Sequence, residues 1–104
     1  MRHIDPPRLR QSANGRGALN IEILSGTTIR LHWTDKPCKW HVNDGAEVFV
    51  VLHGMVDMHH KTGGSGQVTT FTSGYIFYAA EGDEHFAEPI GVARVLVVEK
   101  GGSV

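Results

Sequence analysis

Near its middle the chain reads His41-Val-Asn43-Asp-Gly-Ala-Glu47, and Gly54 follows after six further residues. Residues two apart in an extended strand face the same side of a sheet, so the side chains of His41 and Asn43 lie together. Asp44-Gly45 then predicts a tight turn, and Glu47 opens a second strand. The stretch therefore predicts two strands around a turn, with an imidazole, an amide and a carboxylate close to it.

A second stretch also places a histidine beside a turn. Gly74 is followed after five residues by Ala80-Glu81-Gly82, and His85 comes two residues later. Gly82-Asp83 is a turn signal. It predicts that His85 lies at the start of the next strand.

From residue 18 onward the chain consists of short runs rich in β-branched and aromatic residues. Glycine, proline, aspartate or asparagine separates the runs, and no stretch keeps a helical period over three turns. Many short strands without crossover helices indicate an all-β sandwich or barrel with antiparallel pairing. The predicted strands span residues 19–24, 28–33, 39–42, 48–53, 56–60, 67–71, 75–79, 84–87 and 94–99.

These two stretches resemble the two sequence motifs of the cupin superfamily, over residues 35–89 or about half of the chain. The first motif reads Gly, five residues, His-x-His, three or four residues, Glu, six residues, Gly. The second reads Gly, five residues, Pro-x-Gly, two residues, His, three residues, Asn. The resemblance implies a small single-domain bacterial cupin (cupin 2 conserved barrel type), an antiparallel β-barrel of the jelly-roll or double-stranded β-helix kind. By the same resemblance, a divalent metal would be held by His41, Glu47 and His85, with Asn43 at the position of the fourth ligand.

The chain departs from the family pattern at four positions. Asp35 replaces the first glycine, Ala80 the proline and Pro89 the final asparagine, while Asn43 stands where the second histidine is expected. The change at Asn43 bears on the metal, because an amide oxygen is a harder and weaker donor than imidazole. Asn43 can coordinate through that oxygen, or it can be an ordinary turn residue before Asp44-Gly45.

A physical reason for a metal stands beside the resemblance. A carboxylate at Glu47 inside a barrel costs several kcal/mol unless it is paired or coordinated. Two histidines and one carboxylate suit iron, zinc, nickel or manganese and leave coordination positions open. The alternative is a metal-free polar pocket in which Glu47 bonds a histidine and water. His32 alternates with Leu31 and Trp33 and can line the same pocket.

We predict one domain over residues 1–104, with an N-terminal arm at 1–17 and the barrel at 18–100. Residues 47–53 and 92–98 are apolar on both strand faces, whereas a lone barrel buries only its inner face. Either the arm or a second subunit must cover the outer face. The arm is short and polar, so we predict a homodimer.

The composition narrows the partners and the compartment. A formal net charge of −1 gives no basic surface for nucleic acid, and the longest apolar run, 48–52, is too short to span a membrane. The N-terminus lacks the apolar stretch of a signal peptide. Cys38 is the single cysteine, for which a buried or edge thiol is expected, and the protein is predicted to be cytoplasmic.

Three functions remain compatible with the sequence. The first is a metal-dependent enzyme in which the ion acts as a Lewis acid on a small molecule, with Glu47 or a bound water moving protons. The second is a non-catalytic module that binds a small, sugar-like ligand. The third is a structural barrel dimer that binds no metal.

Overall fold

The computed structural model describes residues 3–5, 16–62 and 65–100. Most of the predicted arm therefore lies outside the described residues, and the first strand begins at Arg16. No helix within the described segments is apolar and long enough to cross a membrane. The strands are β1 (Arg16–Leu24), β2 (Thr27–Thr34), β3 (His41–Val42), β4 (Glu47–Thr62), β5 (Ser65–Phe71), β6 (Ile76–Ala79) and β7 (Glu84–Lys100).

Two of these strands run through positions where the sequence predicts breaks. β4 continues through Gly54, and β7 continues through Pro89 and Gly91. Gly54 and Gly91 have φ angles of 84° and 75°, in the left-handed region that favours glycine. The pairing register of β4 also shifts on both sides of His53. The prediction of separate strands at 48–53 and 56–60, and at 84–87 and 94–99, is therefore wrong, because these signals bend the chain without reversing it.

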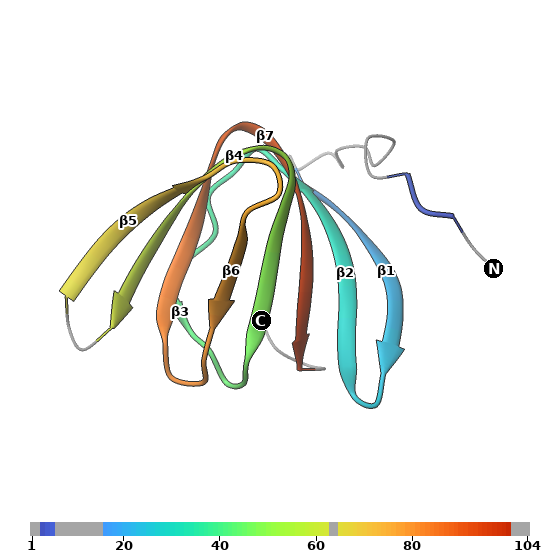
Figure 1. Cartoon of the computed structure of the whole chain (residues 1–104), viewed down its shortest axis with the longest axis horizontal. Helices are drawn as coiled ribbons and strands as arrows, with labels where there is room; N and C mark the ends of the chain where they lie inside the picture. Colours follow the sequence, from blue (N-terminus) through green and yellow to red (C-terminus); the bar gives the residue numbers. More distant parts are fainter. Residues whose placement is uncertain (1–2, 6–15, 63–64, 101–104) are drawn as a thin grey trace.

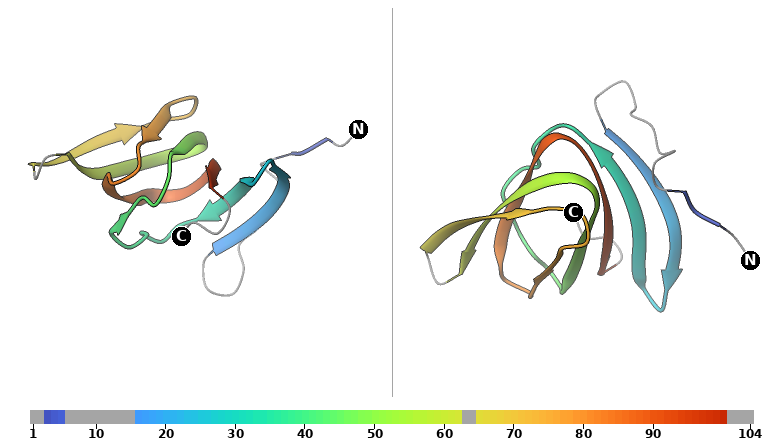
Figure 2. Two further views of the ribbon diagram at one scale, coloured as in Figure 1. Left: turned by 90° about the horizontal axis from the view of Figure 1, so that it is seen from below. Right: turned by 45° about the horizontal axis from the view of Figure 1, so that its top comes forward.

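The matching bends fold the sheet over into two layers (Figure 1). Residues 47–51 of β4 pair with 95–99 of β7, whereas residues 55–61 of β4 pair with 84–90 of β7. The first layer has the order β1-β2-β7-β4-β6, and the second has the order β3-β7-β4-β5. β1 and β5 lie at opposite sides of the fold (Figure 2). Every pairing is antiparallel, which confirms the predicted all-β jelly-roll barrel.

The core fills the space between the two layers, nearest the bends. Alternate residues of β4 and β7 point inward, as the two-residue period of a strand requires. Val51, Met58 and Ala93 are fully buried, and Val56 is 1% exposed. At the bend, a Cβ atom on Gly54 would collide with the carbonyl oxygen of Val92. The two long strands can approach this closely only because residue 54 lacks a side chain.

The outward side of the first layer is also apolar. Residues that pair directly across strands share a face, and two such rows cross β6, β4, β7 and β2. We call these residues the outer apolar face: Tyr78, Val48, Val98 and Ile29 in one row, and Ile76, Val50, Leu96 and Leu31 in the other. Ile76 and Tyr78 are 66% and 64% exposed, whereas Leu31 is buried.

Candidate metal centre

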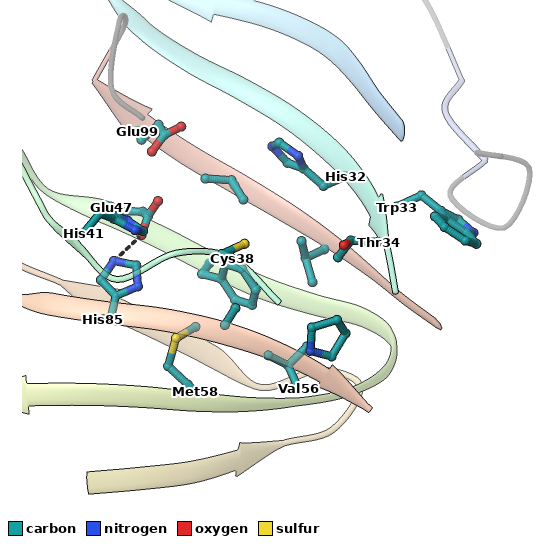
Figure 3. A pocket seen from close by; sticks show the side chains of 15 residues that line it. His32, Trp33, Thr34, Cys38, His41, Glu47, Val56, Met58, His85 and Glu99 are labelled. Carbon is teal, nitrogen blue, oxygen red and sulfur yellow. Dashed lines mark ion pairs between the residues drawn. The ribbon is translucent and has the colours of Figure 1, made fainter. Parts of the chain in front are cut away.

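Three of the four predicted ligand residues meet at the open end of the barrel, opposite the bends. His41 in β3 pairs with His85 in β7, and Glu47 begins β4. One potential ligand atom from each of these side chains lies within 4.8 Å of the others. Glu47 and His85 are buried, at 8% and 4% exposure, and His41 is half-buried. Segments far apart in the sequence thus bring two imidazoles and a carboxylate to one point (Figure 3).

Asn43, the fourth predicted ligand residue, joins this group through His85. The Nε2 atom of His85 lies 2.8 Å from Asn43 Oδ1 and 3.0 Å from Glu47 Oε1, so its N–H can donate to both oxygens. Two ligands at right angles around an ion, with bonds of about 2.1 Å, would lie about 3.0 Å apart. The donor spacing therefore suits neighbouring positions around one cation as well as it suits a hydrogen bond.

His41 is held in the tautomer that a metal ligand needs. Its Nδ1 lies 3.1 Å from the backbone carbonyl of Lys39 and donates its hydrogen there. Nε2 then carries the lone pair, and this atom is buried without a hydrogen-bond partner. A carbonyl that fixes one ring nitrogen and leaves the other free is the usual support of a metal-bound histidine. His85 departs from this pattern, because its Nδ1 is also buried without a partner.

Glu99 adjoins the cluster, although sequence reasoning missed it. It pairs with Glu47 across β4 and β7, and the two side chains are hydrogen-bonded. Burial and the neighbouring Glu47 raise the pKa of Glu99 to about 7. Burial opposes ionisation of Glu47, but hydrogen bonds with His85 and Glu99, together with the charges of His85 and His41, outweigh it and lower the pKa of Glu47. Glu47 is thus the carboxylate of the pair, and Glu99 is the group that holds a proton near neutral pH.

A cavity of about 200 Å³ opens beside the cluster, between the two layers (Figure 3). His32 lines it, which resolves the alternative left open for this residue, and so does the exposed thiol of Cys38. The thiol is thus not buried. The other polar side chains on the cavity wall are those of Thr34, His41, Glu47, His85 and Glu99. The apolar residues on the cavity wall include Phe49, Val56, Met58, Ala87, Pro89, Val95 and Val97.

Solved structures with the same two-layer arrangement identify the fold. A cupin-2 domain protein from Shewanella frigidimarina has 20% sequence identity and a TM-score of 0.71, over 81% of this chain and 79% of that one. A cupin superfamily protein from Desulfitobacterium hafniense has 10% identity and a TM-score of 0.77, over 89% and 84% of the two chains. The chain has the cupin fold. No family sequence model matches it, and neither does any curated protein.

Proteins with the cupin fold that resemble this chain include a metal-containing enzyme. The iron(II) form of HppE is 12% identical, with a TM-score of 0.71 over 95% of this chain. The chain spans about 60% of the length of HppE. At these identities the likeness shows the cupin fold alone.

Proposed function

We propose that this protein binds a divalent metal ion through His41, Asn43, Glu47 and His85 and uses it to bind or convert a small molecule in the adjoining cavity. The observation that carries the proposal is the buried, unpartnered Nε2 of His41, which lies in a cluster with a carboxylate and a second imidazole. A buried acceptor without a partner costs about 1–3 kcal/mol. An ion coordinated by that atom would remove the cost.

Two nitrogen and two oxygen donors restrict the choice of metal. Imidazole suits iron, nickel and zinc, whereas the amide of Asn43 and the carboxylate of Glu47 favour harder ions such as iron(II) and manganese(II). Of the four metals predicted from the sequence, we propose iron(II) or manganese(II) as the natural ion. When bound, the ion supplies a Lewis acid with positions left open for a substrate.

The residues of the proposed metal site would have different roles. In the metal-free site, Asn43 and Glu47 both accept from the Nε2–H of His85, which keeps that nitrogen beside the two oxygens; an ion would take the place of this hydrogen. Glu99 faces the cavity and retains a proton near neutral pH, so it can donate to or accept from a bound molecule. This arrangement is compatible with catalysis as well as with binding alone, and it disfavours a barrel that functions without a metal.

Metal analysis of the untagged protein tests the proposal. We expect about one ion per chain after incubation with iron(II), manganese(II), zinc(II) or nickel(II) and removal of excess, and we expect His85→Ala and His41→Ala to lose it. His59→Ala is the matched control, because His59 lies outside the cluster and bonds Glu88 at 3.1 Å. Wild-type protein that retains none of the four metals would overturn the proposal.

We further propose a homodimer that buries the outer apolar face. Ile76 and Tyr78 on β6 leave more than half of their surfaces exposed, beside a continuous apolar surface formed by β4 and β7. A second copy presents the same face, so the two surfaces can pack together around a two-fold axis. Light scattering should give twice the chain mass of 11.4 kDa, and Tyr78→Lys should reduce it. A wild-type mass of a single chain would contradict the dimer.

Two further features bear on where the protein works and what it contacts. The single cysteine and the slightly negative net charge are compatible with the cytoplasm, where we place it. Neither nucleic acid nor a membrane is proposed as a partner. Fractionation of the source cells would test the location directly.

A further inference from the structure

The inner wall of the barrel changes from polar to apolar along the strands. At the open end Glu47 pairs with Glu99, and His85 lies in the opposite layer. One row closer to the bends, Phe49 pairs with Val97 in the first layer. The strands therefore form a cavity with one polar end, at the cluster of His41, Glu47 and His85, and apolar walls beyond it.

The second layer repeats this gradient. Beyond His85, the next pair toward the bend is Ala87 with Met58, and the pair after that is Pro89 with Val56. All four of these residues line the cavity. A ligand with its head group at the cluster would thus have hydrocarbon on both sides of its remaining part.

The size of the cavity limits what that remaining part can be. An apolar cavity of about 150 Å³ holds one benzene molecule. The cavity here measures about 200 Å³, which is enough for one six-membered ring or a short branched chain together with a small head group. A larger conjugate would have to extend out of the barrel.

The polar groups of the wall are too few for a sugar. The hydroxyl of Thr34 is already engaged on both sides, because it donates to the carbonyl of Lys36 and accepts from the N–H of the same residue. Outside the cluster, the wall otherwise offers His32, Glu99 and the weakly polar Cys38 thiol, and Trp33 adds a single indole N–H. A pyranose would bury several hydroxyls against hydrocarbon, and each unpaired hydroxyl costs roughly tenfold in affinity.

We infer that the ligand is a small hydrophobic molecule with a single oxygen-donor head group, such as a carboxylate or hydroxamate on an aromatic or branched alkyl body. The head group binds at the metal, and the body packs against Phe49, Met58 and Val97. This inference rests on the proposed metal site and names the ligand class for it. It excludes the sugar-like ligand that the sequence leaves open.

Two probes with the same head group test the ligand class. The zinc(II)-loaded protein is titrated calorimetrically with acetohydroxamate and benzohydroxamate, which differ in the body alone. Burying a phenyl ring in place of a methyl group should tighten binding by about 30-fold. Xylose, a polyol of similar size, should bind at least tenfold more weakly than benzohydroxamate.

A pair of matched variants locates the effect in the cavity. Val97→Thr keeps the shape of a buried wall residue and adds a hydroxyl, so it should reduce the preference for benzohydroxamate several-fold and leave acetohydroxamate unchanged. Val68→Thr makes the same change on β5 at a residue that is 57% exposed, and it should alter neither affinity. Circular dichroism and zinc content confirm that both variants fold and carry metal.

The outcomes separate this inference from the proposed function on which it rests. Protein that carries no zinc overturns both. Zinc-loaded protein that binds the two hydroxamates equally, or binds xylose more tightly than benzohydroxamate, overturns the ligand class and leaves the metal site standing. A 30-fold preference that is equal in Val97→Thr and in wild type would also overturn the inference, because the phenyl ring would then lie elsewhere.

Discussion

The two ends of the barrel interior differ in how well their buried atoms are satisfied. Near the bends, Val51, Val56 and Ala93 belong to the hydrophobic core cluster and are almost completely excluded from solvent. At the open end, nitrogen atoms of His41, Asn43 and His85 are buried without hydrogen-bond partners. The same two strands, β4 and β7, supply residues to both ends.

This contrast indicates that the residues that stabilise the fold lie near the bends, whereas the residues available for metal binding lie at the open end of the same strands. Buried polar groups without partners weaken a fold, whereas dense apolar packing strengthens it. A barrel that is well packed at one end can tolerate unpaired donors at the other. Substitutions at the two ends and at the bend between the layers test this separation.

A substitution at the bend should cause the largest loss of folding stability. Gly54→Ala places a Cβ atom against the backbone of Val92 at a positive φ angle, so we expect a loss of about 4 kcal/mol or failure to fold. Gly74→Ala is the matched control: Gly74 has a φ of 91° but open space around a Cβ atom. It should cost only about 1 kcal/mol. If urea denaturation shows similar losses of stability in the two variants, the close approach of Gly54 to the Val92 backbone does not limit what residue 54 can be.

Truncation at the apolar end should cost more than neutralisation at the polar end. Met58→Ala leaves a cavity where the side chain is fully buried, so we expect a loss of about 3 kcal/mol. Glu47→Gln removes a charge and keeps the shape, so the metal-free protein should change by no more than about 1 kcal/mol. Urea denaturation with chelator present compares the two variants. A larger loss in Glu47→Gln would contradict the proposed separation.

Metal should stabilise the polar end specifically. An ion that binds only the folded chain adds about 2.7 kcal/mol when its free concentration is 100 times the dissociation constant. Thermal melting with and without metal should show this gain in wild type and not in Glu47→Gln. Asn43→His replaces the amide by a better donor, and we expect it to tighten binding by about tenfold. Equal gains in wild type and Glu47→Gln would place the ion elsewhere.

The smallest effect concerns the pH dependence of the metal-free protein. The pKa of Glu99 is raised to about 7, so its ionisation disfavours the folded state, and stability falls as pH rises from about 4.5 toward 7. Glu47 has a lowered pKa and acts in the opposite sense, losing its contribution as pH falls below its usual range. Glu99→Gln cannot ionise. Since Glu99 is partly solvated, the variant should exceed wild type by only about 1 kcal/mol at pH 7.5, and by nothing at pH 4.5.

Chemical denaturation at the two pH values measures this difference. If Glu99→Gln is more stable than wild type by the same amount at both pH values, the gain in stability comes from hydrogen bonding and not from removal of the Glu99 charge.

Local patterns were enough to predict the all-β class and the approximate places of most strands, because alternation and turn signals are short-range features. The convergence of His41, Glu47 and His85 was predicted from the resemblance to the cupin motifs, since residues this far apart in the sequence are not brought together by local signals. They could not show that Gly54 and Gly91 bend continuous strands, since the same residues also end strands. Glu99 was missed for a different reason. Its approach to Glu47 depends on the register between β4 and β7, which are distant in the sequence.

The long last strand also has a consequence for how the chain reaches its native state. β7 contributes to both layers and pairs with β2, β3 and β4, so neither layer is complete until residues 84–100 have been synthesised. Pairings over such sequence distances form slowly. A nascent chain on the ribosome can form the β1–β2 and β4–β5 pairs, but the edges of β2 and β4 that bind β7 stay unpaired until it emerges, and the speed with which β7 docks will govern how much of the chain escapes aggregation.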